Sequence, residues 1–434
     1  MIAPVAAGAV LRIAWAFYAA RSTPEFLVSG DQFSYWFLGQ EIGAGRGYRL
    51  PPFTAASSYY PVGYPALLGL IAFITTHTPL PDSSVLSTAV LQVVMSTAAI
   101  ALVGFIAGRL WGRRVALLAA WLVALFPNLI LAVATYSLET TFITLTLAAV
   151  AVLVGHDWST GELPSTRRLV DFGVVIATAV LVRPFALAVV IGLVLACLVV
   201  RGGWRNTART VAIPVGIVVL SMVPWTIRNA VALDAFVPVS TNLGDTLCLD
   251  RTLDANGTFR FSVHEGCAPP DLAEVPRNRA NIGKAAKFVL GHPVKELHLW
   301  GMRIYRMMLN DRPALIEVEE LGEGRFLGHR ARTGLGVLAD TWFFTIGSLA
   351  LFGTWRAGRA NWREPRRLVV FTTGIALMVI PMLLWGAPRF HVPLEPFMAI
   401  AAAVGIDSLR SRELCRSQHP QPVQTDKGHG RPLH

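Results

Sequence analysis

The sequence predicts an all-α protein that crosses a membrane about ten times. Hydrophobic residues make up 53% of the chain and charged residues only 15%, whereas soluble globular proteins carry about 25% charged residues. Several apolar runs are long enough to span about 30 Å of hydrocarbon. The short loops between alternate runs are rich in arginine, which is the pattern that orients membrane helices. The net charge of +11 therefore reflects membrane topology, and we expect no nucleic-acid partner.

The first apolar run, residues 2–20, predicts the first membrane helix. Arg12 lies in its middle and must face protein or extend its charged end to the interface. The run lacks a basic leader, so we expect an uncleaved helix. Tyr18-Ala19-Ala20 resembles a cleavage site and keeps a signal peptide as the alternative.

The next stretch, residues 21–84, is predicted to form the first external loop. Within it, residues 31–44 place Phe33, Trp36 and Phe37 among polar residues at roughly helical spacing, which indicates a helix lying in the membrane interface. Residues 61–74 are apolar but begin Pro61-Val62-Gly63-Tyr64-Pro65 and are too few to span. Such a run is expected to be re-entrant or interfacial.

The remaining spans follow from apolar runs that alternate with polar turns. Residues 169–200 are long enough for two short helices, with Arg183-Pro184 at the corner, because proline cannot continue a helix from its interior. The other predicted spans are residues 85–107, 115–134, 140–155, 211–227, 335–355, 368–385 and 392–406.

This alternation divides the chain into four parts. Residues 1–227 form an N-terminal transmembrane core that includes the first external loop. Residues 228–334 are a long external segment, within which residues 281–309 predict another interfacial helix. Residues 335–407 form the C-terminal transmembrane helices, and residues 408–434 a disordered tail. Both termini are expected in the cytoplasm, because every short loop placed there is rich in arginine.

The same alternation brings a set of polar side chains to the outer face. A site with two carboxylates and several arginines beside lipid suits an anionic lipid that carries a group to be transferred. Arginine matches phosphate oxygens with two donors, and a carboxylate can take the proton of an attacking hydroxyl. The predicted members are Asp31, Tyr60, Tyr64, Glu139, Arg183, Arg228, Arg389 and His391.

Each of these residues also has a purely structural interpretation. Asp31 follows Gly30 at the start of a predicted helix and could be a helix cap. Glu139 could complement a helix dipole, and arginines at helix ends often anchor in the interface. Tyrosines are common in interfacial belts, and His391 could serve only the structure. The histidines show no metal-ligand spacing, so a divalent metal is left open as a cofactor but is not supported by the sequence.

Cys248 and Cys267 lie in the long external segment, where the compartment is oxidising. A disulfide between them would close a loop of about twenty residues and stabilise it by roughly 3 kcal/mol. We therefore predict this disulfide.

Several motifs resemble a known family. They are Gly30-Asp31-Gln32-Phe33-Ser34-Tyr35, Gly45-Arg46-Gly47-Tyr48, Tyr60-Pro61-Val62-Gly63-Tyr64-Pro65, Leu181-Val182-Arg183-Pro184, Pro224-Trp225, Arg228-Asn229, Ser240-Thr241-Asn242-Leu243-Gly244 and Pro388-Arg389-Phe390-His391-Val392-Pro393. In order and placement they resemble the GT-C membrane glycosyltransferases, and most closely the bacterial branch related to protein O-mannosyltransferases and aminoarabinose transferases. The resemblance covers most of the chain up to about Asp407.

The resemblance implies a hexosyl- or pentosyltransferase that moves a sugar from a polyprenyl-phosphate donor to an acceptor hydroxyl, with inversion at the sugar carbon. Asp31 matches the catalytic acid of the first external loop, Glu139 a second acid and Arg183 a basic corner, while Tyr35 ends the first motif. Many relatives have two adjacent acids, but here Gln32 follows Asp31, which weakens the case for a metal.

By the same resemblance, the protein is expected in a bacterial plasma membrane with its active site facing outward. The acceptor is left open among a glycan, a lipid and a protein. The competing function is a flippase or transporter of lipid-linked sugars that performs no transfer chemistry. Transporters tend to show internal repeats and broken helices at the midplane, and no clear repeat is present.

Overall fold

The computed structural model describes residues 1–22, 30–51, 55–78, 84–200, 203–258, 266–319, 326–358 and 363–417. These residues form helices and short turns, and no β-strand occurs among them. The main helices are α1 (Ile2–Ser22), α2 (Gly30–Gly43), α3 (Gly63–His77), α4 (Ser84–Trp111), α5 (Arg113–Ala124), α6 (Pro127–Leu131), α7 (Glu139–Val154), α8 (Thr166–Val182), α9 (Ala188–Val199), α10 (Gly203–Leu233), α11 (Leu243–Cys248), α12 (Glu274–Gly291), α13 (Pro293–Met307), α14 (Pro313–Glu319), α15 (His329–Ala357), α17 (Pro365–Val379) and α18 (Glu395–Ser417).

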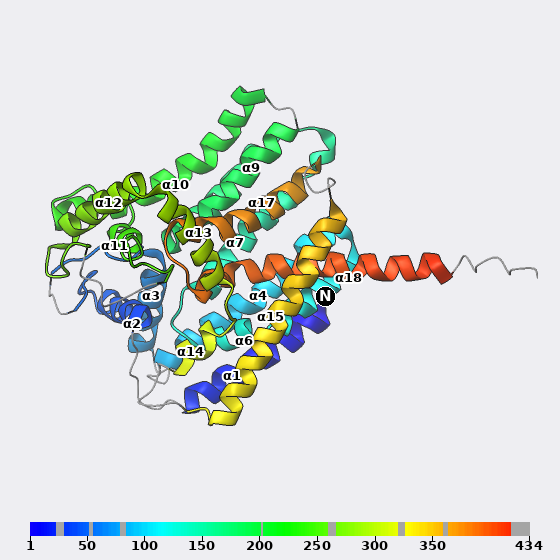
Figure 1. The fold of residues 1–434 in the computed structure, drawn as a ribbon, viewed down its shortest axis with the longest axis horizontal. Helices are drawn as coiled ribbons and strands as arrows, with labels where there is room; N and C mark the ends of the chain where they lie inside the picture. Colours follow the sequence, from blue (N-terminus) through cyan, green and yellow to red (C-terminus); the bar gives the residue numbers. More distant parts are fainter. Residues whose placement is uncertain are drawn as a thin grey trace, which may run out of the picture.

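The helices confirm an all-α, multi-pass membrane protein. Seven helices of the described residues are long and apolar enough to cross a membrane, or eight if α5 and α6 count as one bent span. The predicted spans in residues 169–200 are two helices of 17 and 12 residues, α8 and α9. In Figure 1, α2, α3, α11 and α12 gather on one side of the molecule, while the end of α18 projects on the opposite side.

Prolines mark several helix breaks among the described residues, three of which bear on the predictions. The predicted corner at Arg183-Pro184 is present: Arg183 is extended, and a short 3₁₀ helix, Pro184–Leu187, leads into α9. The span predicted over 115–134 is bent by 59° where α5 gives way to α6, which has Pro127 in its first turn. The single helix predicted over 281–309 is wrong. It is two helices, α12 and α13, because residue His292 before Pro293 is pushed out of the helical conformation.

The C-terminal boundary also differs from the prediction. Helix α18 runs from Glu395 to Ser417, past the expected start of a disordered tail at residue 408. Residues 418–434 lie outside the described part of the chain. A helix is present where one was predicted over 31–44, as α2, and the short apolar run over 61–74 forms α3; their placement in the membrane interface stays a prediction.

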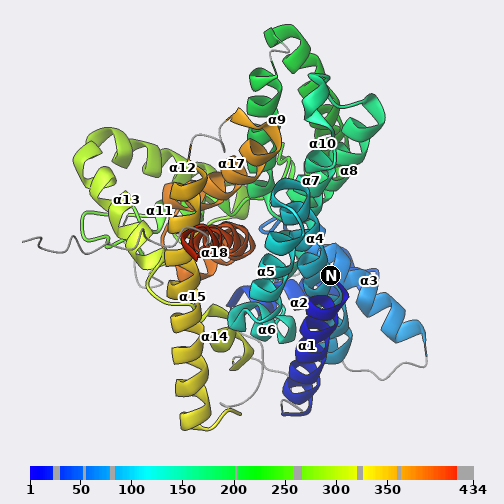
Figure 2. The same ribbon diagram turned by 90° about the vertical axis from the view of Figure 1, so that its right-hand side faces the viewer.

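The hydrophobic core lies between the membrane helices. It contains fully buried side chains of α4, α5, α7, α8, α9, α17 and α18, such as Ile100, Phe142 and Phe172. Helix α18 runs through this bundle and is seen end on in Figure 2, with α15 beside it. Hydrophobic side chains that remain exposed, such as Val219 of α10 and Leu351 of α15, suit a surface in contact with lipid.

Small residues allow α15 and α18 to approach closely. A Cβ atom on Gly353 would overlap the carbonyl oxygen of Ala401 and lie 2.8 Å from the amide nitrogen of Gly405. Gly353→Ala is therefore expected to destabilise the protein by about 1–3 kcal/mol, since extra atoms in a packed contact force the helices apart. Thermal unfolding of the purified protein in detergent measures this effect.

Gly334→Ala is the matched control, because Gly334 lies on the same helix and a Cβ there would meet no atom within 4 Å. This variant is expected to unfold at the wild-type temperature or slightly above it, as alanine favours helix over glycine. Equal melting temperatures for the two variants would contradict the close packing of α15 against α18.

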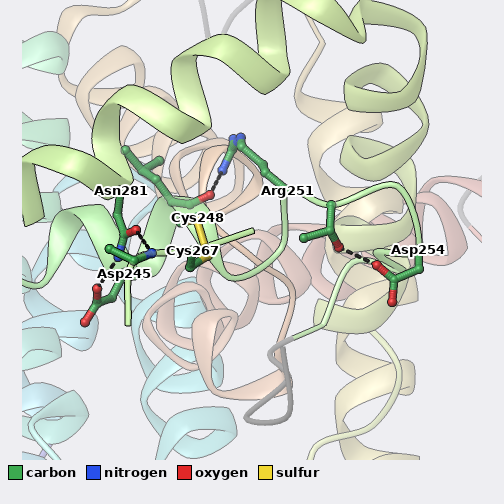
Figure 3. The surroundings of a disulfide bond; sticks show 9 residues. Asp245, Cys248, Arg251, Asp254, Cys267 and Asn281 are labelled. Carbon is green, nitrogen blue, oxygen red and sulfur yellow. Dashed lines mark hydrogen bonds between the residues drawn. A yellow bond between two sulfur atoms is a disulfide. The ribbon is translucent and has the colours of Figure 1, made fainter. Parts of the chain in front are cut away.

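The described part of the 228–334 segment contains the predicted disulfide, which the structure confirms between Cys248 and Cys267. Figure 3 shows Asn281 beside it, where the Asn281 amide donates to Asp245 at 2.7 Å and accepts from the Ala268 N–H at 2.6 Å. On the other side, the Arg251 guanidinium donates to the carbonyl of Leu247 at 2.7 Å. The disulfide therefore holds together a hydrogen-bonded unit.

A buried ionic network connects this unit to the membrane helices. Arg303 pairs with Asp250 at 2.8 Å and with Glu296 at 2.7 Å, and Arg251 pairs with Glu296 at 2.7 Å. The two arginines also donate to the carbonyls of Met382 and Leu383, which follow α17. The 228–334 segment is thereby fixed against the end of the helical bundle.

Replacing both Cys248 and Cys267 with serine is expected to lower the stability of this segment by about 2–4 kcal/mol. Limited proteolysis and thermal unfolding report the change. Reducing agent should shift the melting temperature of the wild type and leave the double variant unaffected. If the reducing agent frees the wild-type thiols without shifting its melting temperature, the disulfide has no stabilising role.

Candidate active site

Asp31 is held by two side chains from distant parts of the chain. Its Oδ1 accepts from the Tyr60 hydroxyl at 2.7 Å, and its Oδ2 accepts from Arg389 at 2.5 Å. In the described part of the chain both oxygens bond to side chains, and no backbone amide of α2 caps onto them. The side chain is 30% exposed, so the carboxylate remains accessible although it is paired.

These partners set the ionisation of Asp31. Burial raises the pKa of Asp31, but the positive charge of Arg389 and the hydrogen bond from Tyr60 lower it by more. The pKa therefore lies below its usual range, and the group is a carboxylate at neutral pH. Burial and the nearby Asp31 charge raise the pKa of Tyr60 well above normal, so its hydroxyl keeps its proton and donates.

The packing of α2 against α3 places Asp31. Gly39 of α2 and Gly69 of α3 lie where a Cβ would overlap the opposite helix, at 2.7 Å from Leu68 and 2.6 Å from Ile42. The two helices therefore run in close contact. Tyr60 precedes α3 in the chain, so this contact brings its hydroxyl to the first turn of α2.

Arg389 comes from the other end of the sequence. It lies in a short 3₁₀ helix, Pro388–Phe390, between α17 and α18. Its guanidinium carbon lies 5.3 Å from the ring centroid of Trp385 and 5.4 Å from that of Phe390. Its Nε is buried without a hydrogen-bond partner among the described residues. One donor of Arg389 is therefore unsatisfied beside the pair with Asp31.

A second acid–arginine pair lies next to the first. Arg183, at the corner after α8, approaches Glu139, at the start of α7, with 3.4 Å between Nη1 and Oε1. The Arg183 guanidinium also lies 5.4 Å from the centroid of Phe390, the ring that Arg389 contacts. Asp31, Arg389, Arg183 and Glu139 thus converge, although the chain separates the first two by 358 positions.

Three predicted tyrosines line one side of this group. Tyr35 packs edge-on against Tyr60 and Tyr64, with ring centroids 4.9 and 5.4 Å apart. Tyr64 is fully buried and its hydroxyl accepts from Gln92 at 3.0 Å. Burial, and then the charge of Asp31, raise the pKa of Tyr35, so its hydroxyl stays protonated beside the carboxylates.

Two further predicted residues contact other groups. Arg228 donates to the carbonyls of Ser57 and Tyr48 at 2.6 and 2.9 Å and packs against Trp225, so it fastens the loop that precedes α3. His391 is fully buried and lies against Met307 and Asp311 rather than Asp31. The structure assigns both residues structural contacts, and a role for either in binding lipid phosphate stays a prediction.

Gln32 occupies the position next to Asp31 where a second acid was expected. Its side-chain nitrogen donates to the carbonyl of Glu317 at 3.0 Å, and its oxygen accepts from the N–H of Tyr136 at 2.9 Å. An ionised glutamate at this position could only accept. Gln32 therefore connects α14 to the turn before α7, which a carboxylate could not do.

Two features of the site were not predicted from the sequence. Glu317 of α14 accepts a hydrogen bond from the Ser137 hydroxyl, two residues before Glu139, so a third acid borders the site. Asp311, His391 and Glu395 also form a fully buried group of metal-ligand side chains. Only the spacing of His391 and Glu395, four residues apart, could have indicated part of this group.

The chain was compared with known proteins. No protein-family model and no curated protein matches it. Among solved structures, it resembles ArnT from Cupriavidus metallidurans bound to undecaprenyl phosphate, with a TM-score of 0.57, 16% identity, and coverage of 94% of this chain and 61% of that one. It also resembles the oligosaccharyltransferase AglB from Archaeoglobus fulgidus in complex with an inhibitory peptide and a dolichol-phosphate, with a TM-score of 0.53 and 15% identity.

The second match covers 98% of this chain and 52% of AglB. The chain therefore spans about half to three fifths of the length of the proteins it resembles. At such low identity the likeness establishes the fold alone. The chain has the fold of the GT-C membrane glycosyltransferases, as its motifs predicted.

Proposed function

We propose that the protein transfers a sugar from a polyprenyl-phosphate donor to an acceptor hydroxyl, with inversion at the sugar carbon and Asp31 as general base. The observation that carries the proposal is the partly exposed Asp31 carboxylate, held by Tyr60 and Arg389 beside a second arginine, Arg183. The fold is that of ArnT and AglB, whose solved structures contain undecaprenyl phosphate and dolichol-phosphate.

In the proposed reaction, the acceptor oxygen attacks the anomeric carbon of the sugar. The new bond forms between these atoms, and the bond from that carbon to the phosphate oxygen breaks. Asp31 takes the hydroxyl proton, and the phosphate leaves with the electron pair. Arg389 and Arg183 stabilise the negative charge that develops on the leaving phosphate.

The pairing of Asp31 suggests how the donor activates its own base. Both carboxylate oxygens are occupied before the donor binds, and Arg389 lowers the pKa of Asp31. A phosphate that bonds to Arg389 competes for this guanidinium and frees Oδ2 of Asp31. With the positive charge partly neutralised, burial raises the pKa of the carboxyl and makes it a stronger base.

We further propose that the protein lies in a bacterial plasma membrane with both termini in the cytoplasm and the site facing outward. The arginine-rich loops between alternate spans support this orientation. The acceptor is a hydroxyl of a glycan, a lipid or a protein. The 228–334 segment bonds through Glu274 and Asp245 to Ser57 and Tyr59, in the loop before α3, and this position supports a role for it in contacting the acceptor.

The direct test is whether purified protein in detergent consumes a polyprenyl-phosphate sugar in the presence of a hydroxyl acceptor. The expected result is free polyprenyl phosphate and a glycosylated product of inverted configuration. A donor that stays chemically intact with every acceptor class, while the protein moves it across liposome membranes, would instead identify a flippase.

A further inference from the structure

Asp311, His391 and Glu395 come together from three places in the fold. Asp311 lies between α13 and α14, His391 between two short 3₁₀ helices, and Glu395 at the start of α18. All three side chains are 0% exposed, and one ligand atom from each lies within 4.8 Å of the others. They are buried, charged or polar groups that the proposed transfer reaction does not use.

The histidine is oriented with its free nitrogen toward the acids. Its Nδ1 lies 2.6 Å from the carbonyl oxygen of Met307, which can only accept, so Nδ1 carries a proton. In the neutral ring, Nε2 then presents a lone pair to Asp311 Oδ1 at 3.2 Å and to Glu395 Oε1 at 3.7 Å. A lone pair that faces two carboxylates is unfavourable unless a proton or a metal cation lies between them.

We infer that Asp311, His391 and Glu395 bind a divalent transition-metal ion, and that Zn²⁺ is the ion that fits best. Zinc binds histidine nitrogen and carboxylate oxygen at about 2.0–2.2 Å in tetrahedral geometry, so its ligand atoms lie roughly 3.3–3.5 Å apart. The observed separations of 3.2 and 3.7 Å bracket this value. Three protein ligands leave the fourth position to a water molecule.

Unsatisfied atoms provide independent support. Asp311 Oδ2 and Glu395 Oε2 are both buried and lack a hydrogen-bond partner among the described residues. Buried carboxylate oxygens without donors are costly, and a bound cation would neutralise them. The competing explanation is a proton shared between the two carboxyl groups, with no metal.

The surroundings hold the ligands as they do in metal sites. Asn128 donates to Glu395 Oε1 at 2.8 Å and accepts from the Ala314 N–H at 3.1 Å. The ring of Phe343 stacks on His391 with the centroids 4.3 Å apart. Such second partners fix the orientation of ligands and raise metal affinity. Because Arg389 is two residues from His391, a bound ion would also hold the Asp31–Arg389 pair in place.

The test measures bound metal and does not depend on the proposed reaction. The full-length protein is purified with a tag that contains no histidine, treated with chelator, loaded with ZnCl₂ and desalted. Elemental analysis should find about one zinc per chain in the wild type, and less than about 0.1 in His391→Gln. Size-exclusion chromatography establishes that each variant is folded, and Glu395→Gln serves if His391→Gln does not fold.

His298→Gln is the matched control, because His298 is an exposed histidine of α13 outside the group. It should bind as much zinc as the wild type. With Co²⁺ in place of Zn²⁺, only proteins with an intact group should show the visible absorption of a tetrahedral cobalt site. Zinc should raise the melting temperature of the wild type and of the control, but not of His391→Gln.

The inference is overturned if folded wild-type protein retains no zinc, or if it retains the same amount as His391→Gln. Either outcome would leave a proton, rather than a metal ion, to neutralise the group. If the wild type binds zinc but transfers no sugar, the metal site is supported and only the proposed function is refuted.

Discussion

Asp31→Asn is expected to lower the rate of sugar transfer by about 10²–10⁴-fold, the range typical for loss of a positioned general base. Asparagine keeps the size of the side chain and can still bond to Tyr60, but it cannot accept the acceptor's proton. The measurement is release of polyprenyl phosphate from a polyprenyl-phosphate sugar by purified protein. Donor binding should change far less than turnover, since the arginines remain.

Glu41→Gln provides the matched control. Glu41 lies on the same helix and is paired with an arginine, Arg46, but that pair is at the surface, where Arg46 is 57% exposed. This substitution removes the same charge from α2 and should leave transfer unchanged. Full activity in Asp31→Asn, or equal losses in the two variants, would refute the role of Asp31 as base.

The second large effect is expected for Arg389→Gln, which should lower transfer by about 10²–10³-fold. The substitution removes charge that stabilises the leaving phosphate, and it also changes the pH dependence. In the wild type the pKa of Asp31 is below its usual range, so the acid limb of kcat/KM should lie below about pH 4. Activity is lost as the pH falls through this pKa, because the protonated carboxyl cannot accept a proton.

Without Arg389, the charge that most lowers the pKa of Asp31 is lost, while burial still raises it. The acid limb of kcat/KM should therefore move to higher pH in Arg389→Gln. Arg366→Gln is the control, since Arg366 pairs with Glu364 at the start of α17, whereas Arg389 lies beyond the end of that helix. An acid limb that stays in place in Arg389→Gln would mean that this arginine does not set the ionisation of the base.

Local features of the fold could be predicted because their causes lie within a few residues. The amphipathic pattern around Phe33 and Trp36 predicted α2, and Arg183-Pro184 predicted the corner after α8. The break at His292 was missed although Pro293 marks it, since the apolar spacing continues across the proline. The periodicity of apolar residues therefore predicted where the helices lie, but it did not predict the break between α12 and α13.

The members of the site could be predicted from topology, which shows the side of the membrane on which a residue lies. Their individual side-chain contacts could not be predicted. Alternation of inside and outside loops was enough to expect Asp31 and Arg389 at the same face, and they form an ion pair. Topology could not show that Arg228 bonds to loop carbonyls or that His391 is buried beside Asp311. Glu317 was missed because its approach to Ser137 depends on how α14 packs, a contact between positions 180 residues apart.

The measurement that tests the central claim most directly is a structure of the protein with a polyprenyl phosphate bound. We expect the phosphate to contact the guanidinium of Arg389 or Arg183, with the Asp31 carboxylate beside it and its bond to Arg389 loosened. A phosphate bound elsewhere, with the Asp31–Arg389 pair undisturbed, would contradict the account.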